Sequence, residues 1–545
     1  MKRRKEFIIV LISLLVIVLS VSVAYFTIRI LGTGKEISVD FADLKVIFTS
    51  GNGTINGTNI EPGWSSGENT FTVKNESNGT YKYNIIIKDL VNTFVTNGFL
   101  VYKITSTDGG YNMTDFVDVP KSSAATDTVL AENISINKGA THTYKIEIKY
   151  LESSTVNQDE DQGKTLSGKI FIEKYEIKLF AKLIEDNSTI GTRNDFSVAF
   201  TTNTPNTLYR ATENGTDVYY FAGQDTESTP INNWIKFGKY QTDLIKYKGF
   251  PDATTDTIYK GYNTMEECTS ATSYNVNCTA YKYASAGDDM YWKIIRSNSD
   301  GSIRLLYFGV SPDTTEGYIG FSPFSINIDS PKYAGYMYGD DDSTLDGIRA
   351  NTNDSTIKKY IDNWYENNLT TYTNYLSNDA VYCNDREVED GITYSTSSNL
   401  YFKSRERLYT SKTPTYDCIN NKDAFSVNNT EAKLKYPIAL MTADEVAYAG
   451  GVSNKEAPMW YYTNSTYNSI TGLSSWRLLS PYGWSTSEAH TWGIGGSRYP
   501  GYLSLNTFIG SYRVRPVTSL KSCVQWKSGD GSATNPYEIV ENGGC

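Results

Sequence analysis

An apolar segment near the start of the chain places the strongest constraint on what the rest can become. It follows a basic cluster, Lys2 to Lys5, and runs from Phe7 to Phe26 with three serines and one tyrosine hydroxyl as its only polar groups. About 20 apolar residues in a helix span the hydrocarbon core of a membrane, which is about 30 Å thick. Because basic residues stay on the cytoplasmic side, the sequence predicts a cytoplasmic segment at 1–6, a transmembrane helix at 7–28 and an extracellular remainder.

The alternative interpretation of this segment is a cleaved signal peptide. Ser22-Val23-Ala24 suits a signal peptidase, and cleavage after Ala24 would release a secreted protein that begins at Tyr25. The apolar run is long for a signal peptide, which favours a retained anchor. Both interpretations export the rest of the chain.

Composition narrows the classes of function. The chain has 545 residues and a net charge of −11 that is spread thinly, which argues against nucleic acid as a partner. His142 and His490 are its only histidines, a scarcity that excludes most His-dependent catalysis and most zinc sites. The 43 tyrosines, together with abundant Asn, Thr, Ser and Gly, are typical of strands joined by polar turns.

Six cysteines all lie in the C-terminal part of the chain. Six cysteines allow 15 pairings, and the sequence does not choose among them. No two have the CxxC spacing of a metal site, and export favours disulfides. Pairing of nearest neighbours is the simplest arrangement and predicts Cys268–Cys278, Cys383–Cys418 and Cys523–Cys545.

Residues 37–176 have the pattern of an antiparallel β-sandwich. Phe71 to Val73 and Tyr144 to Tyr150 alternate apolar and polar side chains, which gives each strand one buried and one solvated face. Turn segments rich in Gly, Asn and Ser separate these stretches. The sequence therefore predicts a mainly β first domain.

Several motifs of this region resemble the TasA/camelysin family of exported Gram-positive proteins. The resemblance implies a jelly-roll-like sandwich and, as in some members, self-assembly into extracellular fibres. The family includes proteins first described as metal-dependent proteases, but this stretch lacks HExxH, so protease activity is not carried over. The motifs are Ala24-Tyr25-Phe26-Thr27, Glu61-Pro62-Gly63-Trp64, Phe71-Thr72-Val73-Lys74-Asn75, Ile136 to Tyr150 and Asp161-Gln162-Gly163-Lys164.

The rest of the chain predicts an α+β domain. Apolar residues at helical spacing predict a helix from Ser355 to Leu369, Thr442 to Glu445 is a capping box, and Asp300-Gly301 predicts the turn of a hairpin. The predicted parts are a linker at 177–207, the domain itself at 208–522 with an insertion at 240–289, and a disulfide-closed tail at 523–545.

The order of motifs in this domain is similar to that of an uncharacterised domain of exported Firmicutes proteins. Its closing pattern also resembles the C-type-lectin-like fold of formylglycine-generating-enzyme relatives. Those enzymes use cysteines near their C-terminal end, and no cysteine lies between Cys418 and Cys523, so that chemistry is not carried over. The motifs are Trp292 to Arg296, Asp300 to Leu305, Cys383-Asn384-Asp385-Arg386, Pro437 to Gly450, Trp476 to Pro481 and Arg513 to Val517.

Aromatic residues crowd the stretch near the C-terminus. Trp476 and Trp492 lie in strand-like runs and are predicted to be buried. Others lie in loops rich in Gly, Ser and Pro, where exposed rings stack on sugars or anchor protein partners, although core packing is the alternative. The candidates for a ligand-binding surface are Trp460, Tyr482, Trp484, His490 and Tyr499.

An acidic run offers the one candidate metal site. Asp340, Asp341 and Asp342 supply the hard oxygen ligands that Ca²⁺ prefers. The Gly and closing Glu of an EF-hand loop are absent, and a solvated acidic loop is the alternative interpretation.

The sequence as a whole predicts a non-enzymatic, membrane-anchored surface protein. Its expected role is adhesion or assembly, with a glycan, a surface protein or further copies of itself as the partner and no cofactor. The alternative is an extracellular hydrolase of cell-wall or host polymers that uses carboxylates such as Asp385 or Glu445. A glycosidase would need two carboxylates about 5–10 Å apart in a cleft.

Overall fold

The protein consists of two compact units, Met1–Glu176 and Ile177–Cys545. Among the residues described, no helix has the length and apolarity needed to cross a membrane, and the segment predicted at 7–28 lies outside them. The computed structural model describes residues 39–41, 44–48, 54–57, 62–76, 80–161, 164–202, 204–251, 259–272, 275–314, 316–456, 459–462, 475–495, 501–507 and 510–541.

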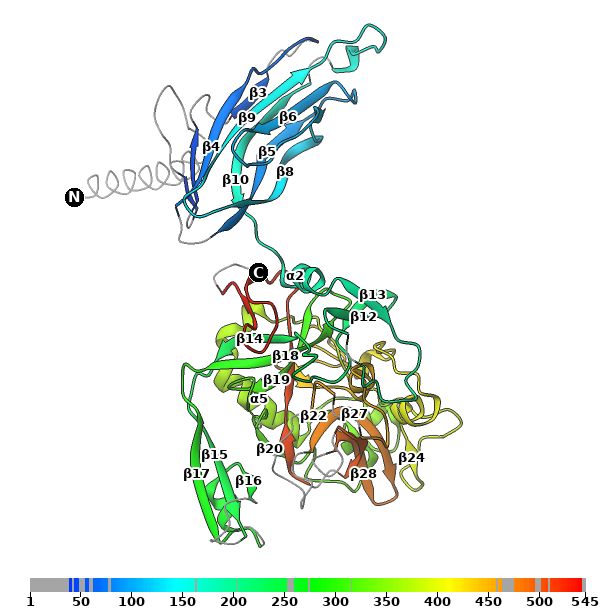
Figure 1. Cartoon of the computed structure of the whole chain (residues 1–545). Coiled ribbons are helices and arrows are strands. Elements are labelled where there is room, and N and C mark those ends of the chain that lie inside the picture. Colours follow the sequence, from blue (N-terminus) through cyan, green and yellow to red (C-terminus); the bar gives the residue numbers. More distant parts are fainter. Residues whose placement is uncertain are drawn as a thin grey trace, which may run out of the picture. The chain divides into compact units, whose positions relative to one another are not determined.

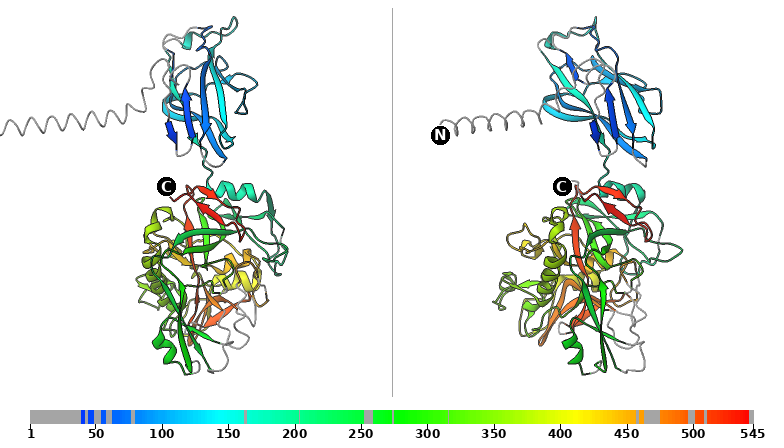
Figure 2. Two further views of the ribbon diagram at one scale, coloured as in Figure 1. Left: turned by 60° about the vertical axis from the view of Figure 1, so that its left-hand side comes forward. Right: turned by 90° about the vertical axis from the view of Figure 1, so that its left-hand side faces the viewer.

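In the first unit two antiparallel sheets enclose one apolar core (Figures 1 and 2). Phe71 and Tyr144 reach this core from one sheet, and Ile85 and Ile170 reach it from the other. Period-two alternation thus buries one face of each sheet, as the sequence predicts. The described strands of one sheet are, in spatial order, β1 (Val39–Phe41), β2 (Leu44–Phe48), β4 (Asn69–Asn75), β9 (Thr141–Tyr150), β6 (Leu100–Ser106) and β7 (Val117–Asp118). Those of the other sheet are, in spatial order, β3 (Thr54–Gly57), β10 (Leu166–Lys174), β5 (Tyr81–Asn92) and β8 (Ser122–Ile136).

The second unit is built on a central hairpin. Strands β18 (Asp289–Ser297) and β19 (Ile303–Gly309) are antiparallel, and Gly301 has a φ of 77° in the turn between them, as predicted from Asp300-Gly301. The hairpin belongs to a larger mixed sheet, whose other described strands are β11 (Thr189–Thr192), β12 (Thr207–Glu213), β13 (Thr216–Tyr220), β14 (Trp234–Lys239), β26 (Ile438–Leu440), β31 (Pro516–Leu520), β32 (Trp526–Ser528) and β33 (Tyr537–Ile539).

A second sheet of this unit carries most of the aromatic C-terminal stretch. Trp476 and Trp492, which were predicted to be buried, are 2% and 0% exposed. The described strands of the sheet are β20 (Gly320–Ser322), β30 (Tyr512–Val514), β27 (Trp476–Ser485), β28 (Glu488–Ile494), β29 (Leu503–Thr507) and β24 (Leu400–Tyr401). Two separate two-stranded sheets pair β21 (Met337–Tyr338) with β22 (Asn353–Asp354) and β23 (Tyr382–Cys383) with β25 (Ala424–Phe425).

Two predicted helices are confirmed. In α5 (Thr356–Asn368), the hydroxyl of Ser355 accepts a hydrogen bond from Lys358 N at the N-terminus, and Trp364 lies on the buried face. In α7 (Ala443–Tyr448), both hydrogen bonds of the capping box are present. The other described helices are α2 (Leu179–Asp186), α3 (Met265–Thr269), α4 (Leu345–Ile348), α6 (Lys403–Arg405), η1 (Asp159–Asp161), η2 (Pro331–Ala334), η3 (Thr370–Tyr375), η4 (Glu406–Ser411) and η5 (Asn421–Asp423).

Two predicted boundaries need correction. Residues 177–207 are not a linker, because Leu179 and Leu183 of α2 lie in the core of the second unit and β11 extends its main sheet. The tail at 523–545 is not a separate lobe, because β33 pairs with β14. Both segments are short and polar in composition, so only the tertiary packing shows that they complete the second unit.

Strands β15 (Leu244–Phe250), β16 (Lys260–Tyr262) and β17 (Asn277–Ala284) form a separate sheet, which we call the arm (Figure 1, green). The arm corresponds to the predicted insertion at 240–289. The Cys268–Cys278 disulfide, with Cα atoms 6.0 Å apart, links α3 to β17 within it.

One carboxylate holds the base of the arm. Glu316 accepts hydrogen bonds from the hydroxyls of Tyr259 and Tyr281 and lies 3.1 Å from Lys248 Nζ and 3.6 Å from Lys246 Nζ. Lys246 is 4% exposed, and its ammonium lies 3.3 Å from the centre of the Tyr283 ring. Burial would raise the pKa of Glu316, but the charges of Lys246 and Lys248 and the tyrosine hydrogen bonds together outweigh burial and hold the pKa below its ordinary value.

Replacing Glu316 by alanine is expected to loosen the arm. Two lysines, one of them buried, would lose their carboxylate partner, which costs about 3–5 kcal/mol for a buried pair. Hydrogen exchange should therefore accelerate at the amides of β15 in the Glu316→Ala protein and stay unchanged in β18. The exposed Glu227→Ala is the control, and unchanged protection of β15 in Glu316→Ala would contradict the assignment.

Candidate functional site

Trp460 and Trp484 do not form the predicted ligand-binding surface. Their side chains are 1% and 3% exposed, and both belong to the core of the second unit. The indole N–H of Trp460 donates to the Phe221 carbonyl at 3.0 Å, and that of Trp484 donates to the Thr396 carbonyl at 3.3 Å. Satisfied N–H groups inside a core indicate packing, so the prediction of exposure was wrong for these two residues.

The other candidates differ from one another. Tyr482 is half-buried, and its ring makes an edge contact with Trp492 at 4.8 Å between ring centres. His490 is half-buried beside Ser485, whose hydroxyl lies 3.3 Å from Nε2, and burial lowers the pKa of His490. Tyr499 lies outside the described residues.

Tyr482 belongs to a surface group that the sequence analysis did not find. The rings of Tyr401, Tyr409 and Tyr482 surround the guanidinium of Arg405, whose central carbon lies 4.0, 5.4 and 6.0 Å from the three ring centres. We call these four residues the tyrosine patch. Tyr409 is 43% exposed, and the other two tyrosines are half-buried.

A carboxylate and the local backbone fix the patch in place. Nη1 of Arg405 donates to both oxygens of Glu389 at 3.0 and 2.8 Å, which orients the guanidinium. Tyr401 lies on β24 opposite Gly483 of β27, and Tyr409 lies in the π-helix η4, a type of helix that often marks functional sites. Tyr401, Arg405 and Tyr409 recur at intervals of four in the sequence. Residues at this spacing are neighbours on a helix surface, so the spacing was the one sequence signal that could have indicated the patch.

The patch has the chemistry of a binding surface. Tyrosine rings offer an apolar face to a sugar ring or a protein side chain, and their hydroxyls supply hydrogen bonds at low cost in side-chain entropy. Because Glu389 already orients Arg405, little further ordering is needed when a ligand binds.

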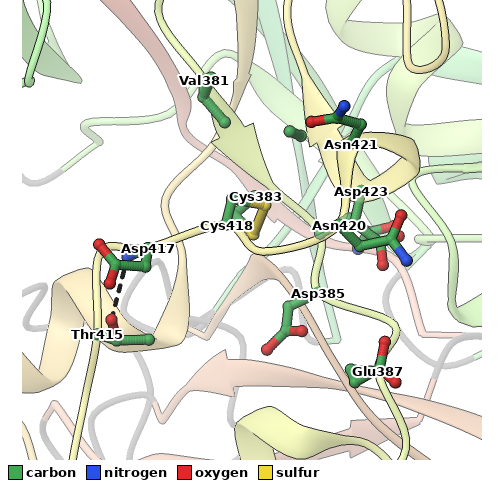
Figure 3. The surroundings of a disulfide bond; sticks show 12 residues. Val381, Cys383, Asp385, Glu387, Thr415, Asp417, Cys418, Asn420, Asn421 and Asp423 are labelled. Carbon is green, nitrogen blue, oxygen red and sulfur yellow. Dashed lines mark hydrogen bonds between the residues drawn. A yellow bond between two sulfur atoms is a disulfide. The ribbon is translucent and has the colours of Figure 1, made fainter. Parts of the chain in front are cut away.

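The two carboxylates of the hydrolase alternative line one small polar cavity, which we call the arginine pocket. Arg296, Arg304 and Arg407 also line it, together with Cys383 of the Cys383–Cys418 disulfide. Figure 3 shows this disulfide with Asp385 and Asp417 close to it. The volume is about 20 Å³, which suits one water molecule and leaves no space for a sugar ring.

Glu445 is fully engaged within this pocket. One of its oxygens accepts from Arg296 Nε at 3.1 Å and from Arg304 Nη1 at 2.8 Å, and the other accepts from Thr442 N at 2.9 Å. Burial would raise the pKa of Glu445, but the charges of Arg304 and Arg296 outweigh burial and lower it. A carboxylate held in this way is a structural counter-ion.

Asp385 differs from Glu445 in its pKa. Burial raises the pKa of Asp385 above its ordinary value, and the charge of Arg407 offsets part of the increase. Arg407 Nη1 lies 2.5 Å from Asp385, and the same guanidinium binds both oxygens of Asp444. The pKa of Asp385 is raised and that of Glu445 is lowered, and such opposite pKa shifts are typical of a catalytic acid and base. Here, however, both carboxylates are paired with arginines in a cavity that excludes substrate.

The neighbours of Asp385 in the Cys383-Asn384-Asp385-Arg386 segment are also structural. Asn384 is fully buried and donates to the Leu479 carbonyl at 2.8 Å. Arg386 is fully buried too, with Nε 2.6 Å from Asp423 and its other nitrogens bound to the carbonyls of Met337 and Ile348 and to two further oxygens. This segment therefore joins several elements of the second unit.

The acidic run does not converge on a metal site. Asp340 accepts from Asn353 Nδ2 at 2.9 Å, Asp341 binds the hydroxyl of Ser343 at 2.6 Å, and Asp342 accepts from Ser330 Oγ at 2.7 Å. Within the described ranges, no three His, Cys, Asp or Glu side chains are grouped as metal ligands. Each of the three carboxylates instead binds a different polar side chain of the protein.

Two of the three predicted disulfides are confirmed, Cys268–Cys278 and Cys383–Cys418. The third predicted pair joins Cys523 to Cys545, which lies outside the described residues. Comparison with protein families gives no match for this chain, and comparison with curated proteins gives none either.

If Glu445 is a structural counter-ion, replacing it with glutamine should destabilise the second unit. Two buried guanidiniums would lose their shared negative charge, which costs about 3–5 kcal/mol. Chemical denaturation followed by tryptophan fluorescence measures this loss, because Trp64 is the one tryptophan outside that unit. The exposed Glu431→Gln should be neutral, and a Glu445→Gln protein of normal stability would contradict the structural role.

Proposed function

We propose that this protein is an exported, membrane-anchored surface protein whose second unit binds a glycan or a surface protein without catalysis. The tyrosine patch carries the proposal. Its three rings surround one oriented guanidinium, and Tyr409 presents 43% of its surface to solvent. Such a surface buries apolar area on binding and forms hydrogen bonds at its edges.

The arginine pocket argues against the hydrolase alternative. A hydrolase needs a carboxylate that is free to exchange a proton with its substrate and space for that substrate. Glu445 and Asp385 are each held by arginines, and the cavity between them measures about 20 Å³. Binding at an open surface requires neither condition.

The disulfides indicate that the chain folds in an oxidising compartment. The apolar segment at 7–28 supports a single-pass membrane anchor with the two units outside the cell. We further infer that the first unit is a TasA-like, jelly-roll-like sandwich that serves as a stalk or assembly module, and that the second unit is related to the C-type-lectin-like fold. The quoted sequence motifs and the mainly β architecture support these two assignments.

The membrane anchor makes a prediction that separates it from a cleaved signal peptide. The protein should remain in the membrane fraction after washing with carbonate, and its intact mass should be that of an uncleaved chain. Deleting residues 7–28 should leave the protein inside the cell. A mature protein that begins at Tyr25 and appears in the medium would contradict the anchor.

The tyrosine patch makes a second prediction. Replacing Tyr409 by alanine should weaken binding to the glycans that the full-length protein selects on an array by about 5- to 30-fold, since a central aromatic contact contributes about 1–2 kcal/mol. Tyr111→Ala, at a residue of the first unit that is 38% exposed, is the matched control. The proposal would be wrong if the array gave no ligand and sizing gave no self-association, or if both variants lost binding equally.

A further inference from the structure

A second surface of the second unit has a different chemistry from the tyrosine patch. It is a groove of about 530 Å³ formed by β21, β22, the first turn of α5 and the segment before β26. Four lysines and one aspartate supply all of its charged lining: Lys358, Lys359, Lys433, Lys435 and Asp354. We call it the lysine groove, and it is a local basic surface on a chain with a net charge of −11.

Two of these lysines have their charges balanced by the protein. Lys358 is buried, with Nζ 3.2 Å from Asp354 and 2.6 Å from Asp362. Lys435 lies 3.4 Å from Glu366, in an exposed pair that contributes little because solvent screens it. The buried ion pair therefore fixes the floor of the groove and adds no free charge.

The other two lysines are available to a ligand. Lys359 and Lys433 are exposed, and they reach the groove from α5 and from the segment before β26 respectively. Among the residues that the structure describes, no carboxylate forms a salt bridge with either of them. Their charges attract an anion to the groove.

We infer that the lysine groove binds an extracellular polymer that carries phosphate groups along its backbone. The lining contains lysines and no arginine. Lysine binds phosphate as a compact point charge and needs no fixed bidentate geometry to do so. A groove of about 530 Å³ holds a short stretch of chain, and two free lysines from separate elements fit a ligand with repeated charges better than a single small anion.

This inference does not depend on the tyrosine patch, since the two surfaces share no residue. The test uses the full-length protein in detergent and inorganic polyphosphate as the probe. Binding is followed by fluorescence anisotropy at two salt concentrations. The double variant Lys359→Gln and Lys433→Gln should bind polyphosphate about 10- to 30-fold more weakly. Its plot of log affinity against log salt concentration should also be less steep than that of the native protein, by about 1–2 in slope.

A matched control removes two exposed lysines elsewhere, Lys138→Gln and Lys455→Gln, and should keep the affinity of the native protein. Tyr409→Ala should also bind polyphosphate normally, so failure of the glycan proposal is distinguishable from failure of this one. Absence of binding, or equal losses in the groove and control variants, would overturn the inference. Equal affinity of the groove for polyglutamate would overturn the assignment to phosphate.

Discussion

The second unit depends on one buried carboxylate that is shared by two arginines. Glu445, at the N-terminal end of α7, contacts Arg296 of β18 and Arg304 of β19, and Arg296 also contacts Glu213 of β12 at 2.8 Å. A buried charge without a partner costs several kcal/mol, so α7 and the central hairpin tolerate only the arrangement in which these groups meet. The capping box fixes the orientation of Glu445, because its second oxygen accepts from Thr442 N. A local sequence signal thus specifies a long-range contact.

The same use of buried charge recurs elsewhere in the second unit and ties up the carboxylates that take part in it. Asp423 is shared by Arg386 and Arg349, and Glu316 is shared by Lys246 and Lys248. Each of these carboxylates is engaged by two cationic side chains. General acid–base work requires a group that gains and loses a proton during turnover. In these pairs the carboxylates stabilise the fold, which agrees with the proposal that the unit acts through its surface.

Sequence reasoning succeeded where a few neighbouring residues decide the structure. The helix α5, the capping box of α7 and the Asp300-Gly301 hairpin follow from local spacing or turn chemistry. The two confirmed disulfides match the simplest pairing of nearest neighbours, although the sequence itself left 15 pairings open. It failed where tertiary packing decides. Trp460 lies in a stretch that resembles a loop, yet its indole is buried against the Phe221 carbonyl, 239 residues away. Leu179 and Leu183 were assigned to a linker because two apolar residues do not show what core they complete.

The same limit applies to the two proposed binding surfaces, which are assembled from segments distant in sequence. Tyr401 and Tyr482 are brought together because β24 pairs with β27, and Glu389 orients Arg405 between them. In the lysine groove, Lys359 is held by α5, whose Trp364 packs into the core. A side chain that is already ordered loses less entropy when a ligand binds, so such a surface needs fewer contacts for a given affinity. In the proposed function the core therefore serves recognition indirectly, because it fixes the strands and the helix from which the aromatic and cationic side chains project.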